Sequence, residues 1–167
     1  GLSEEAKKIY QDIIKKFPKN KKALDGIKTL ASKALANISD IEDPPNDQLK
    51  GLVDLYTKRM YKEALGKASQ LLEQFPNSIN LYIIVGGSNK GLGKLDEAIE
   101  AYSKALSIKP DFPEAYNNMG NAFKEHGKLD EAIEAYSKAL SIKPDYAEAS
   151  SNMGNALQEH GKLDEAI

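Results

Sequence analysis

Apolar side chains recur along residues 113–146 with the spacing of an α-helix. Apolar positions that follow i, i+3, i+6 and i+7 share one helical face, and two such stripes follow each other here. The first stripe comprises Tyr116, Met119, Ala122 and Phe123, and the second comprises Ala132, Ile133, Tyr136, Ala139 and Leu140. Gly127 separates the stripes and Pro144 follows the second, and both residue types end helices. The pattern predicts an antiparallel helix pair in which Gly120 lets Ala132 and Ala139 approach closely.

This helix pair is one copy of a longer repeat. The segment GKLDEAIEAYSKALSIKPD at residues 93–111 recurs letter for letter at residues 127–145, at an offset of 34 residues. A third copy starts at Gly161 and reaches Ile167, the last residue. The period defines repeats 79–112, 113–146 and a truncated 147–167. A degenerate repeat, 45–78, precedes them, and it carries Leu52 and Leu71 where small residues are expected.

The register breaks upstream of this array. Residues 3–18 have the pattern of a second helix and residues 21–36 that of a first helix, so residues 1–36 are expected to form a degenerate N-terminal helix pair. Residues 37–47, NISDIEDPPND, combine acidic residues and two prolines with few apolar groups, which is typical of a linker. We therefore predict a helix pair at 1–36, a linker at 37–47 and a repeat array at 48–167. Both ends of the chain are expected to be cuts through a longer array.

The 34-residue period and its signature residues are those of the tetratricopeptide repeat (TPR) family. In repeat 113–146 the signature residues are Tyr116, Met119, Gly120, Phe123, Ala132, Tyr136, Ala139 and Pro144. The chain therefore resembles a TPR protein. The resemblance implies an all-α fold, a right-handed α-solenoid of stacked antiparallel helix pairs. First helices would line its concave side and second helices its convex side.

The resemblance also implies a peptide-binding groove on the concave side, formed by fixed positions of each first helix. In the last two repeats the expected groove residues are Asn117, Asn118, Asn121, Lys124, Glu125, Ser151, Asn152, Asn155 and Gln158. Asparagine amides at a repeating interval could grip the backbone of an extended peptide. Alternatively, they only solvate an exposed helix face and share a register because the repeat was duplicated.

Repeat 79–112 departs from this asparagine ladder. Its corresponding residues are Asn80, Ile83, Ile84, Gly87, Lys90 and Gly91, so the groove is expected to be more apolar there. The glycine-rich stretch 86–94 does not match a phosphate-binding loop, because Ser88 replaces the first required glycine and Leu95 the required hydroxyl. We expect no nucleotide site in this repeat.

The composition limits the chemistry that the chain can perform. Cysteine is absent and only two histidines occur, which excludes disulfides and thiolate metal sites. His126 and His160 lie one repeat apart, and duplication explains both without a metal. No serine has a histidine placed to activate it, and the acidic residues form no convergent pair. We therefore expect a protein that is not an enzyme, with no cofactor, no metal and no catalytic residues.

Charge and hydropathy exclude two further classes of partner. The 23 Lys and Arg residues and 25 Asp and Glu residues give a net charge of -2, so a basic nucleic-acid footprint is absent. No apolar run approaches the roughly 18 residues of a membrane span. We predict a cytoplasmic protein that binds neither nucleic acid nor the membrane interior.

These observations favour a non-catalytic protein–protein interaction module, a scaffold or adaptor that binds a peptide or protein segment in the concave groove. Residues 117–121, NNMGN, and 151–155, SNMGN, look most like repeats of O-linked N-acetylglucosamine transferases and of bacterial TPR proteins with glycosyltransferase or sulfotransferase domains. One alternative is therefore the substrate-recognition arm of such an enzyme. Another is a self-associating scaffold, a homo-oligomer formed through exposed solenoid ends near Ala156 and Leu157.

Overall fold

The computed structural model describes residues 43–164, which form seven helices and no strand. The helices are α3 (Asn46–Thr57), α4 (Tyr61–Gln74), α5 (Ile79–Gly91), α6 (Leu95–Ile108), α7 (Pro113–Glu125), α8 (Leu129–Ile142) and α9 (Ala147–Asp164). We call α3, α5, α7 and α9 the first helices and α4, α6 and α8 the second helices. The all-α helical repeat fold expected from the sequence is confirmed.

The predicted N-terminal helix pair and the predicted linker are described only in small part or not at all. The predicted helix pair at 1–36 lies outside the described residues, as does the linker up to residue 42. The predicted linker extends to residue 47, whereas α3 already begins at Asn46. Asn46 and Asp47 therefore belong to the helix, because residues that follow a proline can form the first turn of a helix.

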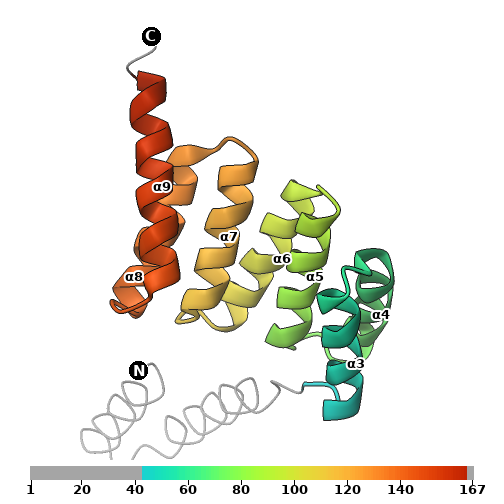
Figure 1. Cartoon of the computed structure of the whole chain (residues 1–167). Coiled ribbons are helices and arrows are strands. Elements are labelled where there is room, and N and C mark those ends of the chain that lie inside the picture. Colours follow the sequence, from blue (N-terminus) through green and yellow to red (C-terminus); the bar gives the residue numbers. More distant parts are fainter. Residues whose placement is uncertain (1–42, 165–167) are drawn as a thin grey trace, which may run out of the picture. The chain divides into compact units, whose positions relative to one another are not determined.

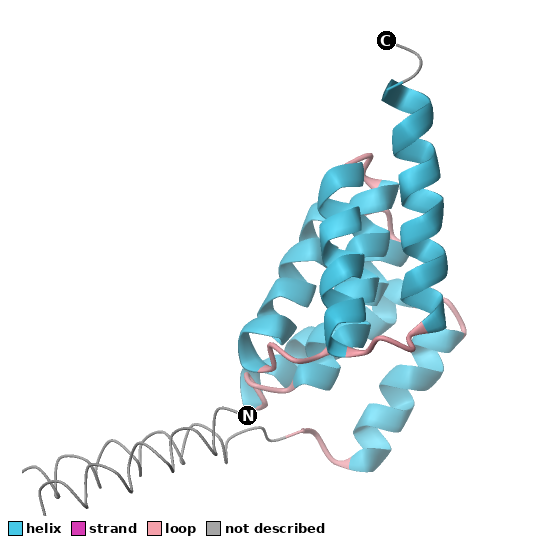
Figure 2. Cartoon of the chain, turned by 90° about the vertical axis from the view of Figure 1, so that its left-hand side faces the viewer, coloured by secondary structure: helices cyan, strands magenta, loops and turns pink. Residues whose placement is uncertain are grey.

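The helices form two layers. Helices α3, α5 and α7 each pack on the second helix of their own repeat and on the first helix of the next repeat, and α9 packs on α7 and α8. Figure 1 shows α5, α7 and α9 following one another in one layer, with α6 and α8 in the other. Figure 2 shows that short loops join the helices. None of the described helices is long and apolar enough to cross a membrane.

Local sequence signals set the helix ends. The Ser78 hydroxyl accepts a hydrogen bond from the Leu81 amide and caps α5, and Pro113 opens α7. Gly93 and Gly127 follow α5 and α7 with φ angles of 74° and 79°, which glycine adopts without steric cost. These glycines therefore turn the chain from a first helix into a second helix, as the sequence predicts.

Gly161 occupies the same repeat position as Gly93 and Gly127, yet it does not end its helix. Helix α9 continues through it to Asp164, so the turn expected at the third copy of the repeat is absent. A glycine permits a turn but does not enforce one, and α9 keeps its helical conformation through Gly161.

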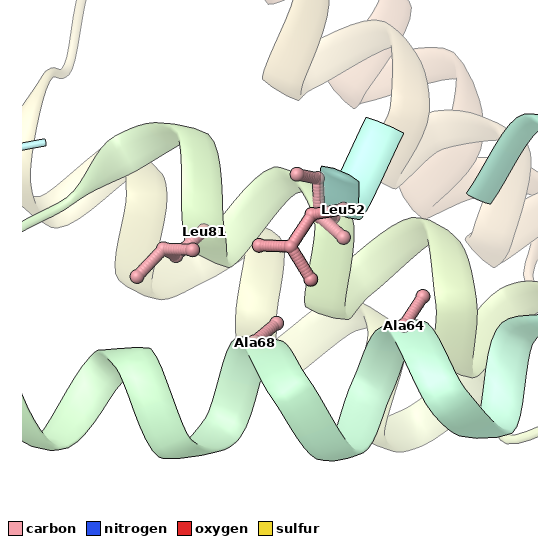
Figure 3. Packing of buried hydrophobic residues seen from close by; sticks show 5 residues of the cluster. Leu52, Ala64, Ala68 and Leu81 are labelled. Carbon is pink, nitrogen blue, oxygen red and sulfur yellow. The ribbon is translucent and has the colours of Figure 1, made fainter. Parts of the chain in front are cut away.

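The hydrophobic core is divided into clusters that join neighbouring repeats. The first cluster combines Leu52 of α3 with Ala64 and Ala68 of α4 and with Leu81 and Ile84 of α5. Figure 3 shows Leu52 above the two alanines of α4, with Leu81 beside them. The other two clusters comprise Ala98, Tyr102 and Ala122, and Ala132, Tyr136 and Ala156. Each repeat thus covers the apolar face of the next one.

The partner of Gly120 differs from the prediction. A Cβ atom at Gly120 would lie 2.6 Å from Cε1 of Tyr136, so the missing side chain admits a tyrosine ring rather than Ala132 or Ala139. One repeat earlier, a Cβ atom at Gly86 would lie 2.5 Å from Cε1 of Tyr102. A ring from the second helix therefore fills the space between the helices in both repeats.

Candidate functional site

A pocket of about 460 Å³ opens between the first helices of the three consecutive repeats that begin at residues 45, 79 and 113. Its lining residues are Leu49, Val53, Tyr56, Asn80, Ile83, Ile84, Tyr102 and Asn118. Three come from α3, three from α5, one from α6 and one from α7. The size lies within the range of roughly 300 to 1,000 Å³ found for ligand pockets, and the mostly apolar lining is typical of them.

The pocket exists because repeat 79–112 carries small and apolar residues where the next repeat carries asparagines. Ile83 and Ile84 replace the first two asparagines of the ladder, and Gly87 replaces Asn121. A Cβ atom at Gly87 would lie 2.7 Å from the Tyr56 hydroxyl oxygen, so the tyrosine of α3 occupies the space that a side chain would take. The wall of the pocket is therefore aromatic and aliphatic rather than amide.

Tyr102, a buried residue of α6, contributes a hydroxyl to this wall. Only 1% of the residue is exposed, and burial raises its pKa above the usual 10.0, with further contributions from nearby Tyr56 and Glu125. In the next repeat burial, together with three glutamates, raises the pKa of Tyr136 to about 12. Both phenols are therefore neutral at physiological pH and can donate a hydrogen bond.

Two amides complete the polar groups of the pocket. Asn80 Nδ2 donates to Asp43 Oδ2 at 2.8 Å, and Ser78 donates to the other oxygen of the same carboxylate. No hydrogen bond from the Asn118 side chain occurs within the described part of the chain. Asn118 therefore presents a free amide at the edge of an apolar pocket.

Most of the predicted asparagine ladder is bonded within the protein. Asn117 is fully buried, its Nδ2 donates to Glu148 Oε1 at 3.0 Å, and its Oδ1 accepts from Asn152 Nδ2 at 3.0 Å. Asn121 Oδ1 accepts from the Tyr136 hydroxyl at 2.7 Å. In this structure the Asn117 amide therefore joins α7 to α9 and does not reach the surface.

The predicted charged residues also make contacts between repeats. Lys124 Nζ lies 3.6 Å from Glu159 Oε1, and one repeat earlier Lys90 Nζ lies 2.8 Å from Glu125 Oε1. Each pair joins neighbouring first helices at the same repeat positions. Exposed pairs of this kind contribute about 0 to 1 kcal/mol, so they align the repeats more than they stabilise them.

The remaining predicted residues, Ser151, Asn155 and Gln158, are exposed on α9. They lie far along the array from the pocket, since no residue of α9 lines it. Of the groove residues predicted in the last two repeats, only Asn118 belongs to the pocket, together with Asn80, Ile83 and Ile84 predicted in repeat 79–112. The structure thus separates an apolar pocket between α3, α5 and α7 from a polar surface on α9.

The two histidines each face a carboxylate of the preceding repeat. His126 Nδ1 lies 3.3 Å from Asp96 Oδ1, and His160 Nε2 lies 2.9 Å from Asp130 Oδ1. The spacing of one repeat between the histidines is therefore the spacing of an inter-repeat contact. Residues 43–164 contain no group of three or more His, Cys, Asp or Glu side chains that could hold a metal ion.

Four pocket residues were not predicted from the sequence, namely Leu49, Val53, Tyr56 and Tyr102. Three of them lie two repeat lengths before Asn117, Asn121 and Lys124, in the degenerate repeat 45–78. Extending the ligand-facing positions to that repeat would have identified these three. Tyr102 has no such signal, because it belongs to a second helix and reaches the pocket past Gly86.

Sequence comparisons identify the repeats. A family model described as TPR repeat matches residues 91–127 and 120–161, and another described as tetratricopeptide repeat matches residues 1–20. A curated relative, Superkiller complex protein 3 of Homo sapiens, is 35% identical over 63 residues, which is 38% of this chain. The match spans only 4% of the length of that relative.

Solved structures with a similar fold include MamA, at 28% identity and a TM-score of 0.61, over 89% of this chain and 86% of MamA. The first TPR domain of Spaghetti (RPAP3), bound to an HSP90 peptide, has 20% identity and a TM-score of 0.65, over 68% of this chain and 90% of that domain. The Yersinia enterocolitica chaperone SycD, in complex with a YopD peptide, has 16% identity and a TM-score of 0.63, over 68% of this chain and 92% of the SycD chain.

The predicted similarity to glycosyltransferase repeats gains no support from these relatives and stays a prediction. The family models and the fold agree on the repeat class, because the matched residues 91–127 and 120–161 lie in the helical array from α6 to α9. The chain therefore carries tetratricopeptide repeats, stacked in an all-α helical repeat fold.

Proposed function

We propose that the face formed by the first helices binds an extended segment of another protein, whose apolar side chains enter the pocket between α3, α5 and α7. The observation that carries the proposal is the pocket itself, which combines six apolar or aromatic side chains with two amides. Val53, which lines the pocket, is 47% exposed and so offers apolar surface to a ligand.

Known proteins of similar fold support this proposal. The RPAP3 domain and SycD are each described as complexes with a peptide. At such low sequence identity the similarity establishes a common fold but not a common ligand, so the ligand has to be inferred from the pocket. Its apolar lining, which includes no Lys or Arg, fits an uncharged segment better than an acidic one such as the HSP90 peptide SRMEEVD.

The polar groups of the pocket support a binding role rather than catalysis. They are two asparagine amides and two tyrosine hydroxyls, and among residues 43–164 no histidine, carboxylate or lysine lines the pocket beside them. A nucleophile or general acid requires such a neighbour to activate it. We therefore assign this module a non-catalytic role as a scaffold or adaptor in the cytoplasm, without nucleic acid as a partner.

The test is the selection of random twelve-residue peptides against the whole chain, followed by fluorescence anisotropy with the selected peptides. Val53→Asp places a carboxylate in the pocket without disturbing the core, since Val53 is half exposed. Roughly tenfold weaker binding is expected, equivalent to about 1.4 kcal/mol. Ser137→Asp, an exposed position on α8, is the matched control and should bind normally. Equal binding by the Val53 variant would show that the pocket is not the site.

The exposed polar residues of α9 extend this site in the proposal. Asn155→Ala should weaken a peptide that is long enough to reach from the pocket to α9, and should leave a short peptide unaffected. The length dependence separates a continuous groove from an isolated pocket. If long and short peptides respond equally to the substitution, the groove does not include α9.

Self-association is a second candidate, favoured by one surface. Leu157 is 49% exposed on α9, and no atom lies within 4 Å of a Cβ atom built at neighbouring Gly154. Two copies that cover these residues would form the homo-oligomer expected from the sequence. Sedimentation velocity at rising concentration tests it, with Leu157→Lys as the variant that should remain monomeric. A wild-type protein that stays monomeric throughout removes this candidate.

A further inference from the structure

The Tyr102 hydroxyl belongs to a residue of the pocket wall and has no hydrogen-bond partner within residues 43–164. The residue is 1% exposed and lines the pocket, and no hydrogen bond from its hydroxyl occurs within residues 43–164. Buried hydroxyls are normally hydrogen-bonded, because burial removes their water and an unbonded group receives nothing in return. The pocket therefore contains a donor that only a ligand or solvent entering it can satisfy.

The following repeat shows which chemical group is missing. There the equivalent tyrosine, Tyr136, donates to the side-chain amide oxygen of Asn121 at 2.7 Å. The residue that precedes Asn121 by one repeat is Gly87, which has no side chain. The two tyrosines occupy the same repeat position, and each ring packs against a glycine of the first helix, Gly86 for Tyr102 and Gly120 for Tyr136. The Tyr56 side chain occupies the space of the missing residue, so Tyr102 lacks the amide oxygen that Tyr136 bonds, and a carbonyl that enters the pocket would take the same role.

The charges around the pocket favour a neutral acceptor over a carboxylate. No Lys or Arg of the described residues lines the pocket, and Lys90 is already paired with Glu125 at 2.8 Å. Glu125 is close enough to raise the pKa of Tyr102, after the larger effect of burial. A ligand carboxylate at the tyrosine would meet this negative charge without a compensating cation, whereas an amide carbonyl would not.

We infer that Tyr102 is the specificity-determining residue of the pocket, and that its hydroxyl donates a hydrogen bond to an uncharged amide carbonyl of the bound peptide. The inference rests on the peptide binding proposed above. The aliphatic and aromatic side chains of the pocket receive the apolar group next to that carbonyl, and Asn118 supplies a second amide at the edge. The ligand is thus an apolar peptide segment, bound away from its charged terminus.

The chain offers a matched pair of variants for the test. Tyr102→Phe removes a hydroxyl that has no partner in the protein, whereas Tyr136→Phe removes one that is bonded to Asn121. With a peptide whose binding depends on Val53, Tyr102→Phe should weaken binding roughly 3- to 10-fold and leave the unfolding midpoint unchanged. Tyr136→Phe should lower the unfolding midpoint and leave binding unchanged. Equal binding by Tyr102→Phe and the wild type would overturn the inference.

A second measurement tests the preference for a neutral carbonyl. N-acetyl-leucine amide and N-acetyl-leucine share one side chain and differ in an amide against a carboxylate. Titration of the labelled chain should shift the backbone amide resonances of Ile83 and Ile84 with the amide and not with the acid. Equal shifts with both compounds would overturn the inference.

The outcomes distinguish this inference from the proposed function. If the selected peptides lose affinity with Val53→Asp but not with Tyr102→Phe, the pocket binds peptides and the role of Tyr102 is wrong. If no peptide depends on Val53, the proposed function fails and the inference fails with it. If Val53→Asp and Tyr102→Phe weaken binding and Tyr136→Phe does not, the proposed function and the inference about Tyr102 are both supported.

Discussion

Asn117 gives the sharpest prediction about how the repeats are held together. Its buried amide donates to Glu148 and accepts from Asn152, at 3.0 Å in each case, so Asn117→Ala removes two hydrogen bonds between α7 and α9. A neutral hydrogen bond contributes about 1 kcal/mol and one to a charged group about 1.5 to 3 kcal/mol. Both partners lie partly in solvent and regain water in the variant, which reduces the loss. We expect a destabilisation of about 1.5 to 3 kcal/mol.

Urea unfolding followed by circular dichroism measures this loss, as a shift of the midpoint at unchanged slope. The matched control is Asn155→Ala, an exposed asparagine on α9, which should stay within about 0.5 kcal/mol of the wild type. The double variant with Asn152→Ala should be less unstable than the sum of the two single variants, because they share one hydrogen bond. A stability of Asn117→Ala equal to that of the control, with peptide binding lost, would show that the amide faces the ligand.

Three further predictions concern stability. Gly120→Ala should destabilise the protein by about 1 to 3 kcal/mol, because the added Cβ atom meets a tyrosine ring. Gly66→Ala on α4 has open space around it and should stabilise the protein by up to about 1 kcal/mol. Thermal unfolding of both variants checks the difference, and the same change in both would contradict the prediction. Ser88 has a buried hydroxyl oxygen with no partner within the described residues, so Ser88→Ala should raise the free energy of unfolding by about 1 kcal/mol or more; a urea midpoint below that of the wild type would refute this. Adding EAYSKALSIKPD after Ile167 would complete a second helix that covers Leu157. Burial of Leu157 should contribute about 2 kcal/mol and raise the melting temperature. An unchanged melting temperature would show that the added helix does not pack on α9.

The repeat class and the helix ends could be predicted from the sequence because their causes are local. A glycine at the end of a first helix and a proline at the start of the next act within one turn of the backbone, and the apolar spacing fixes which face is buried. The same locality explains the failure at Gly161. That glycine permits a turn but does not enforce one, and the helix continues where no second helix packs against it.

The pocket could be predicted only in part, because its walls come from different repeats. Positional analogy finds the α3 residues once the degenerate repeat is included, but nothing in the sequence near Tyr102 indicates that its hydroxyl reaches the face of the first helices. That outcome depends on two glycines of the preceding helix, Gly86 and Gly87, which make room for tyrosines of the second helix and of the preceding repeat.

The sequence by itself determined the period, the helix pairs and the all-α stack, since these follow from residue spacing and from backbone preferences. Only the tertiary structure decided which polar side chains remain open to a ligand. Asn117 and Asn118 are neighbours in the chain, yet one is buried against α9 and the other lines the pocket. The reason is physical: a side chain is free or bonded according to what the next repeat places against it, and that partner lies about one repeat length away in the sequence.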